Sequence, residues 1–281
     1  SVLQEKILFR RISNTFNTIK LCVRVLKKDK ELIFFPVMAA ILVLTVALIF
    51  WSMGLIDIQE QQTQSSSLSD FIPEIILLFV ANFLIVLFNS ALVSGALHRL
   101  RGGDPNVASA MNHALKHIHH IFIWSIIVTI VAILIAAIKG NRRGGFMRQL
   151  FGSMLQAGWT MMTFFVVPII VAENMTPISA IKKSSSLFKK TWGDQVTANF
   201  GFGIIQILAI AVSGALGWFF GLLNPTLGIG IGVLCAAISV SVIYTLEGIY
   251  KAALYEFALG EKPLEFEQHD LSRAYTAKAV A

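Results

Sequence analysis

The hydrophobic pattern of the chain consists of long apolar runs separated by short polar segments. The hydrocarbon layer of a membrane is about 30 Å thick, so a helix needs roughly 20 apolar residues to cross it. The runs do not alternate between polar and apolar residues, as IIVTIVAILIAAI (126–138) illustrates, so they are not the lipid-facing strands of a barrel. The runs that are long enough are 32–53, 71–95, 118–138, 151–172, 197–221 and 226–258.

These runs predict six transmembrane helices. The last run is longer than a bilayer requires, so its helix is expected to tilt or to project from the membrane before it ends near Gly260 and Pro263. Pro168 is expected to kink the fourth helix, because proline removes a backbone hydrogen bond. The predicted fold class is therefore all-α, a polytopic membrane helical bundle, with the whole chain (1–281) as a single membrane domain.

Each polar segment before a pair of runs carries an apolar stripe at helical spacing, which predicts three amphipathic helices on the cytoplasmic side. The first lies within 1–31. The plan of one amphipathic helix and one hairpin, used three times, is consistent with an internal repeat. Its register stays open, because aligning Pro105 with Pro177 gives an offset of 72 residues and aligning the stripes gives 74. The stripes are Ile12, Phe16, Ile19, Val23 and Leu26; Val107, Met111, Ala114 and Ile118; and Ile181, Ser185, Phe188 and Trp192.

Composition and charge support the membrane class and suggest an orientation. Apolar residues make up 56% of the chain and charged residues 14%, against about 25% charged residues in a soluble domain, which excludes a disordered chain and a soluble globule. Lys and Arg accumulate on the cytoplasmic side of membrane proteins. We therefore expect a multi-pass protein of the cell inner (plasma) membrane, with both termini and the tail (259–281) in the cytoplasm.

Four of the 23 basic residues do not fit this orientation, namely Lys139, Arg142, Arg143 and Arg148. They lie between the third and fourth runs, in a loop that the other basic residues place outside. Either they contact lipid headgroups or a partner on the outer side, or the span count is wrong there and a re-entrant segment is present.

The net charge of +7 indicates anionic membrane lipid as a partner. Basic residues on amphipathic helices commonly face the headgroups, although packing of these helices against the bundle is an equally weighted alternative. Nucleic acid is not expected, because exposed aromatic residues are not interleaved with the basic ones. The candidate lipid-contacting residues are Lys20, Arg24, Lys27, Lys28, Lys182, Lys183, Lys189 and Lys190.

Polar residues within the spans either join neighbouring helices or line a transport path. Glu247 precedes Lys251 by one helical turn, so an ion pair is expected there. Two GxxxG motifs, at 217–221 and 228–232, predict close helix contact in the last hairpin. The candidate intramembrane polar residues are Asn82, Asn89, Asn199, Gln206 and Glu247.

No motif for catalysis is present. The two cysteines, Cys22 and Cys235, form no CxxC motif, and neither a GxSxG nor a P-loop occurs. His113 and His117 lie on one helix face and could share a metal ion, but the HExxH glutamate is missing, and histidines facing the headgroups are the favoured interpretation. We therefore assign no catalytic, cofactor-binding or metal-binding residue and do not expect an enzyme.

A set of motifs in the second half of the chain resembles a bacterial multi-pass membrane family known only as a domain of unknown function. They are AGWTMMTFFVVP (157–168), Glu173-Asn174, Pro177, AIKKSS (180–185) and KTWGD (190–194), and LKKDKELIFFP (26–36) is similar to the opening segment of that family. The plan is also similar to the membrane domain of some glycerophosphodiester phosphodiesterases, but no phosphodiesterase domain is found in this sequence. The resemblance implies a membrane fold and supplies no catalytic residue.

Two functional hypotheses follow. The first is a non-enzymatic scaffold or subunit of a larger membrane assembly, with a protein partner or a second copy of the chain and with interfacial helices on anionic lipid. The alternative is a transporter or lipid-handling protein that uses the polar faces of the second and fifth spans.

Overall fold

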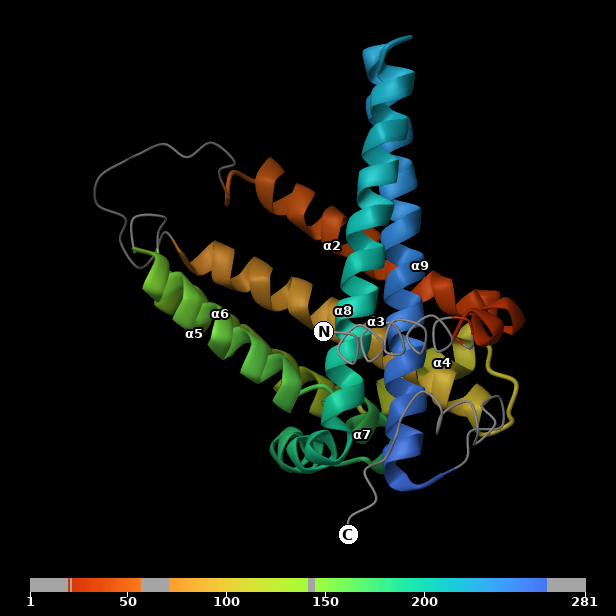
Figure 1. Cartoon of the computed structure of the whole chain (residues 1–281). Coiled ribbons are helices and arrows are strands. Elements are labelled where there is room, and N and C mark those ends of the chain that lie inside the picture. Colours follow the sequence, from red (N-terminus) through yellow and green to blue (C-terminus); the bar gives the residue numbers. More distant parts are fainter. Residues whose placement is uncertain (1–19, 21, 57–70, 141–144, 262–281) are drawn as a thin grey trace, which may run out of the picture. The chain divides into compact units, whose positions relative to one another are not determined.

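A computed structural model describes residues 20, 22–56, 71–140 and 145–261, with the side chains of 145 and 190–201 left out. Within these ranges all regular structure is helical. A short helix over 22–28 comes first. It is followed by the 3-10 helix η1 (Lys30–Ile33) and the helices α2 (Phe34–Ser52), α3 (Ile72–Leu100), α4 (Val107–Lys116), α5 (Ile118–Lys139), α6 (Gly145–Met162), α7 (Val166–Glu173), α8 (Pro177–Gly221) and α9 (Pro225–Leu259) (Figure 1).

Six helical segments among the described residues are long and apolar enough to cross a membrane, which confirms the all-α polytopic class. Each corresponds to one predicted run, with ends that differ by up to five residues. The segments are Lys30–Ser52, Ile72–Leu100, Ile118–Lys139, Phe146–Glu173, Phe202–Gly221 and Pro225–Leu259.

The chain divides into two compact units. Unit 1 comprises Ser1–Phe34, Gly95–Val107 and Leu187–Ala281, and unit 2 comprises Phe35–Ser94 and Ala108–Ser186. The reading of the whole chain as one membrane domain stays a prediction.

Aromatic side chains join the helices of unit 2. The rings of Phe79 and Phe83 on α3 meet Phe122 on α5 edge to face, with centroids 5.4 and 5.9 Å away. Trp124 on α5 stacks on Trp159 on α6 at 5.8 Å, and these two helices run side by side in Figure 1. Such pairs add directional contacts to the burial of apolar surface.

Pro168 interrupts the fourth span, as the sequence predicts. The segment is divided into α6 and α7 by a turn over 163–165, in the position where proline would clash with the carbonyl of the preceding turn. The backbone N–H of Phe165, which is buried, donates to Oγ of Ser184 at 3.0 Å. A side chain from the start of α8 therefore satisfies a backbone group at the break.

Glycines hold α8 and α9 together in unit 1. A Cβ atom built on Gly228 would lie 2.4 Å from Cα of Gly221, and one on Gly217 would lie 3.0 Å from Cα of Gly232. The two backbones are thus in direct contact, as both GxxxG motifs predict. Asn224 caps the start of α9, because its Oδ1 accepts from the N–H of Thr226 at 2.9 Å.

Gly260 ends α9 in the left-handed conformation, with φ of 85°. Its N–H bonds back to the last helical turn, an arrangement that glycine adopts without strain. The predicted stop at this glycine is confirmed, while Pro263 lies outside the described residues.

The buried faces of the second and third amphipathic segments differ from the predicted stripes. In α4 the buried residues are Ala110 and Ala114, whereas Ile118 is exposed. At the start of α8 the buried face is displaced by one residue from the predicted one, because small side chains allow close packing there and Ser184 makes a buried hydrogen bond. That face consists of Pro177, Ala180, Ser184 and Leu187, and the side chain of Trp192 is not described.

Arg148, one of the four basic residues that do not fit the orientation, completes the end of α5. Its Nε and Nη2 donate to the carbonyls of Ile138 and Ala137 at 2.6 and 2.8 Å. The last carbonyls of a helix lack partners within the helix, and a cation there also opposes the helix dipole. Arg148 therefore bonds to the end of α5, a role that differs from both explanations offered above, namely contact with headgroups or a partner and a wrong span count. Arg142 and Arg143 lie outside the described residues.

Candidate functional site: charged and polar residues at the ends of the spans

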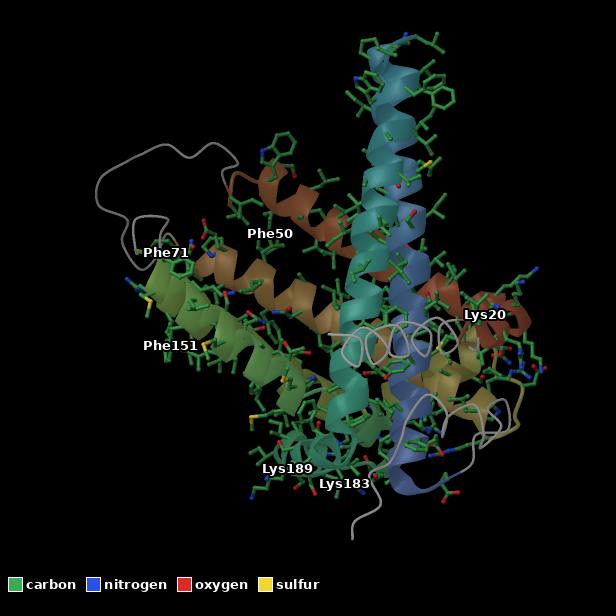
Figure 2. All side chains as sticks on the ribbon, viewed as in Figure 1. Lys20, Phe50, Phe71, Phe151, Lys183 and Lys189 are labelled. Carbon is green, nitrogen blue, oxygen red and sulfur yellow. The ribbon has the colours of Figure 1, made fainter. Side chains whose placement is uncertain are left out.

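The helix over 22–28 separates basic from apolar side chains. Cys22, Val25 and Leu26 are buried in unit 1, and the opposite side carries what we call the basic face. Asp29 alone separates this helix from η1, where the first candidate span begins. Figure 2 shows Lys20 at the start of this segment. The basic face consists of the exposed side chains of Lys20, Arg24, Lys27 and Lys28.

Burial raises the pKa of the Cys22 thiol to about 12. A thiolate would lose its hydration in this apolar contact, so the neutral thiol is favoured. Cys22 thus behaves as a small apolar side chain that fixes the helix, and not as a reactive group.

An ion cluster in unit 1 fixes the segment after this helix. The Nε and Nη2 of Arg99, at the end of α3, both donate to the carboxylate of Asp29, whose side chain is 5% exposed. Nη2 of Arg99 also contacts Oδ1 of Asp104 at 2.5 Å. A buried carboxylate held by a guanidinium in two places is well compensated for the loss of water.

A second pair in unit 1 joins the 101–107 segment to α9. Nη2 of Arg101 donates to Oε1 of Glu256 at 2.7 Å, and the side chain of Glu256 is 5% exposed. Oε2 of Glu31 accepts from the backbone N–H of Val107 at 3.3 Å. Together with Asp29–Arg99, these contacts hold the N-terminal helix, the 101–107 segment and the end of α9 in one unit.

Sequence reasoning did not identify Asp29 or Glu256 as structural anchors. A signal exists for Glu256, because it is an isolated acid within the apolar run AALYEFAL (252–259) and a buried charge requires a partner. Its partner could not be found, since Arg101 is 155 residues away along the chain.

The predicted lipid-contacting lysines at the start of α8 have different surroundings. Lys182 and Lys189 are exposed, whereas Nζ of Lys183 donates to Oε1 of Glu173 at 2.7 Å. Figure 2 labels Lys183 and Lys189 on this helix. The side chain of Lys190 lies outside the described ones. Lys182 and Lys189 therefore remain available to headgroups, and Lys183 has an internal partner.

Four histidines of unit 2 meet where α4 passes into α5, and we call this set the histidine corner. Nδ1 of His113 lies 2.8 Å from Oγ of Ser94, and Nδ1 of His117 donates to Oδ1 of Asn174 at 2.9 Å. The rings of His113 and His117 are 5.2 Å apart. Asn174 ends α7 in the left-handed conformation. The corner consists of His113, His117, His119 and His120, with Ser94 and Asn174 as partners.

Across the described ranges, no three His, Cys, Asp or Glu side chains come together in a way that could hold a metal ion. A metal ion shared by His113 and His117 would therefore have no third protein ligand among the described residues.

Two of the predicted intramembrane polar residues have partners within their own unit. Nδ2 of Asn82 on α3 donates to Oγ1 of Thr129 on α5 at 3.1 Å. Nζ of Lys251 lies 2.7 Å from Oε1 of Glu247, one turn away on α9. Asn89 and Gln206 are half-buried, and the side chain of Asn199 is not described.

A groove lies along the α8–α9 hairpin near its turn. Its volume is about 590 Å³. Glycines that lack a side chain leave this space, and the remaining lining is apolar. The lining residues include Gly217, Trp218, Gly221, Pro225, Ile229 and Gly232.

A comparison with known families identifies the family of this chain and assigns it no function. Residues 70–263, more than half of the chain, match DUF6159, which is described as a family of unknown function. The chain belongs to the DUF6159 family. The matched region contains the motifs at 157–194 and ends close to Gly260, whereas the helix over 22–28 precedes it. No curated protein matches this member of the DUF6159 family.

Proposed function

We propose that this membrane protein is a non-enzymatic scaffold or subunit that attaches a larger membrane assembly to an anionic leaflet. The observation that carries the proposal is the basic face of the 22–28 helix. It ends one residue before the first span, so chain connectivity keeps it near the membrane boundary. Basic residues close to an anionic surface each contribute about 1 kcal/mol of attraction.

The orientation belongs to the same proposal. The basic face and the exposed Lys182 and Lys189 would meet the cytoplasmic leaflet of a bacterial inner membrane, with both termini on that side. The similarity in plan to the membrane domain of some glycerophosphodiester phosphodiesterases stays an expectation.

The α8–α9 hairpin supports a role in assembly. Apolar side chains are exposed on α8 and in the turn that follows it, as Ile207 (69%), Trp218 (70%) and Leu223 (78%) illustrate. Side chains project from the hairpin along its length in Figure 2. A transport path would instead need polar groups open to a substrate. The partners of Asn82 and Glu247 favour the structural role over transport.

The lipid part of the proposal is tested by lipid retention. We expect the purified protein, titrated with phosphatidylglycerol or phosphatidylcholine, to retain more phosphatidylglycerol in native mass spectrometry. The triple variant Lys20→Gln/Arg24→Gln/Lys27→Gln should weaken this preference more than tenfold, since three attractions are removed. The charge-preserving variant Lys20→Arg/Arg24→Lys/Lys27→Arg should retain it. Equal retention of both lipids by the wild type would contradict the proposal.

The assembly part is tested separately. Extraction of native membranes into lipid nanodiscs, followed by single-particle mass measurement, should give particles heavier than one chain with a fixed stoichiometry of components. Particles that contain a single copy and no other protein would contradict a scaffold role and leave the lipid preference as a separate result.

A further inference from the structure

The histidine corner contains a buried imidazole with an unsatisfied nitrogen. His120, in the first turn of α5, is 9% exposed, and its Nδ1 has no hydrogen-bond partner among the residues that the structure describes. The ring of His119 lies 3.9 Å from that of His120, centroid to centroid. A buried polar atom without a partner usually marks strain or a functional role.

The surroundings of the histidine corner suit the neutral form of His120 better than its protonated form. Nδ1 of His117 donates to Oδ1 of Asn174, which is a neutral acceptor. A proton added at Nδ1 of His120 would create a buried, charged N–H without an acceptor in this structure.

The charges that act on His120 come from its own corner. They are His117 and His119, which are both like charges once protonated. On the opposite segment, Glu173 beside Asn174 is already held by Lys183 and is not free to compensate a new cation. Protonation of His120 therefore adds an uncompensated buried charge and repulsion within the α4–α5 turn, which weakens the packing of this turn.

We propose that the histidine corner is a pH-sensitive contact, which joins the α4–α5 turn to the α7–α8 turn when its imidazoles are neutral and releases it when they are protonated. Asn174 ends α7, and α8 begins at Pro177. Release would thus free the start of α8, which carries the exposed Lys182. This inference concerns unit 2 alone and does not depend on the proposed scaffold role.

The test measures the distance across the contact in the full chain. Nitroxide labels would be attached at Lys116→Cys and Ile178→Cys, two exposed positions on either side, in a Cys22→Ala/Cys235→Ala background in lipid nanodiscs. Pulsed EPR between about pH 8 and about pH 5, on either side of the ordinary imidazole value of about 6.5, should show one short distance at the higher pH. A longer component should replace it at the lower pH. An identical distribution at both ends of the range would overturn the proposal.

Variants separate the proposed contact from a general effect of acid. His120→Phe keeps a ring of similar size but cannot be protonated, so the long component should be lost. His98→Gln removes an exposed histidine of unit 1 and should leave the transition unchanged. If His120→Phe does not fold, His117→Gln keeps a donor for Asn174 without a charge and should move the transition to lower pH. A transition that His120→Phe, or His117→Gln in its place, leaves unaltered would refute the assignment to this corner.

Discussion

Several hydroxyl side chains in the spans satisfy their own hydrogen-bonding needs within one helical turn. Ser90, Ser125 and Thr129 each donate to the backbone carbonyl four residues earlier, at 2.7 to 2.8 Å. Such local bonds make a hydroxyl tolerable in an apolar helix. Thr129 has a second partner, because its Oγ1 also accepts from Asn82 on another helix. It is therefore the one of these three hydroxyls for which a contact between helices is described.

Removal of the Asn82–Thr129 contact should weaken the association of α3 with α5. We expect Asn82→Leu and Thr129→Val to lower the unfolding free energy by less in combination than the sum of their separate effects. The coupling energy should be about 0.6 kcal/mol and no more than about 1.7 kcal/mol, the range for hydrogen bonds between membrane helices. Reversible unfolding in mixed micelles measures the unfolding free energy of the wild type, the two single variants and the double variant. A coupling energy of zero would mean that the Asn82–Thr129 bond does not contribute to stability.

Arg148→Met should loosen the end of α5. Without the guanidinium, the carbonyls of Ala137 and Ile138 lose their partner, and the amides of the last turn should exchange roughly three- to tenfold faster. Hydrogen-exchange mass spectrometry of peptides that cover 130–140 provides the measurement. Gln149→Ala, at the neighbouring exposed position, is the control, and equal exchange in both variants would exclude the capping role.

Cys22 should resist alkylation in the folded protein. Its raised pKa of about 12 leaves about three-thousandfold less thiolate near neutral pH than an ordinary thiol with a pKa of about 8.5. Iodoacetamide should therefore modify Cys22 only when the protein is unfolded in SDS. Because the pKa is higher in the folded state, the contribution of this thiol to stability is complete below about pH 8.5 and declines at higher pH, where the unfolded chain ionises first. Rapid modification of the native protein at neutral pH would contradict the burial.

The residue contacts differ in how far the sequence could predict them. Glu247 and Lys251 are four residues apart on one helix, so their pairing follows from helical geometry alone. Asp29 and Arg99 are 70 residues apart, and nothing in the local pattern links them. The histidine corner was visible as a cluster, but its partners Ser94 and Asn174 depend on tertiary structure.

At the scale of the helices, apolar length was the most informative feature of the sequence. The thickness of the hydrocarbon layer imposes a minimum span, so each predicted run corresponds to a helical segment. The amphipathic stripes were less informative. Ala114 belongs to a predicted stripe and is buried, but Ala110 and Ala180 are buried outside the stripes because small residues permit close approach. The stripes instead included larger side chains such as Ile118 and Ile181.

The contact between α8 and α9 should depend on individual glycines. In Gly228→Ala the new methyl group would lie within 2.5 Å of backbone atoms of Gly221 and Gly217, which cannot move without separating the helices. We expect a loss of about 1–3 kcal/mol, the usual cost of overpacking, and a lower melting temperature in detergent. Gly230→Ala meets nothing within 4 Å and should change stability by less than about 0.5 kcal/mol. Equal stability of the two variants would contradict the close contact.

At the scale of the whole chain, an even number of spans returns the polypeptide to the side on which it began. The sequence predicts from the number of apolar runs and the distribution of Lys and Arg that both termini lie on one side. The biochemical role could not be obtained in the same way, because Asn82 and Glu247 have structural partners and the DUF6159 family is of unknown function.

The orientation itself is open to direct measurement. Fluorescent protein fusions at either terminus should be bright, as expected in the cytoplasm, and alkaline phosphatase inserted in the 57–70 segment should be active, as expected outside. A fluorescent N-terminal fusion together with an active phosphatase fusion at the C-terminus would require an odd number of spans.

The capping arginine of α5 also affects how this protein could be re-engineered. Membrane proteins are inverted in the laboratory by exchanging loop cations for neutral residues and observing which way the polypeptide inserts. At Arg148 that exchange would remove a sorting signal and unravel a helix terminus in the same step. An inverted or degraded product of such an exchange could therefore result from the weakened end of α5 as well as from a changed membrane orientation.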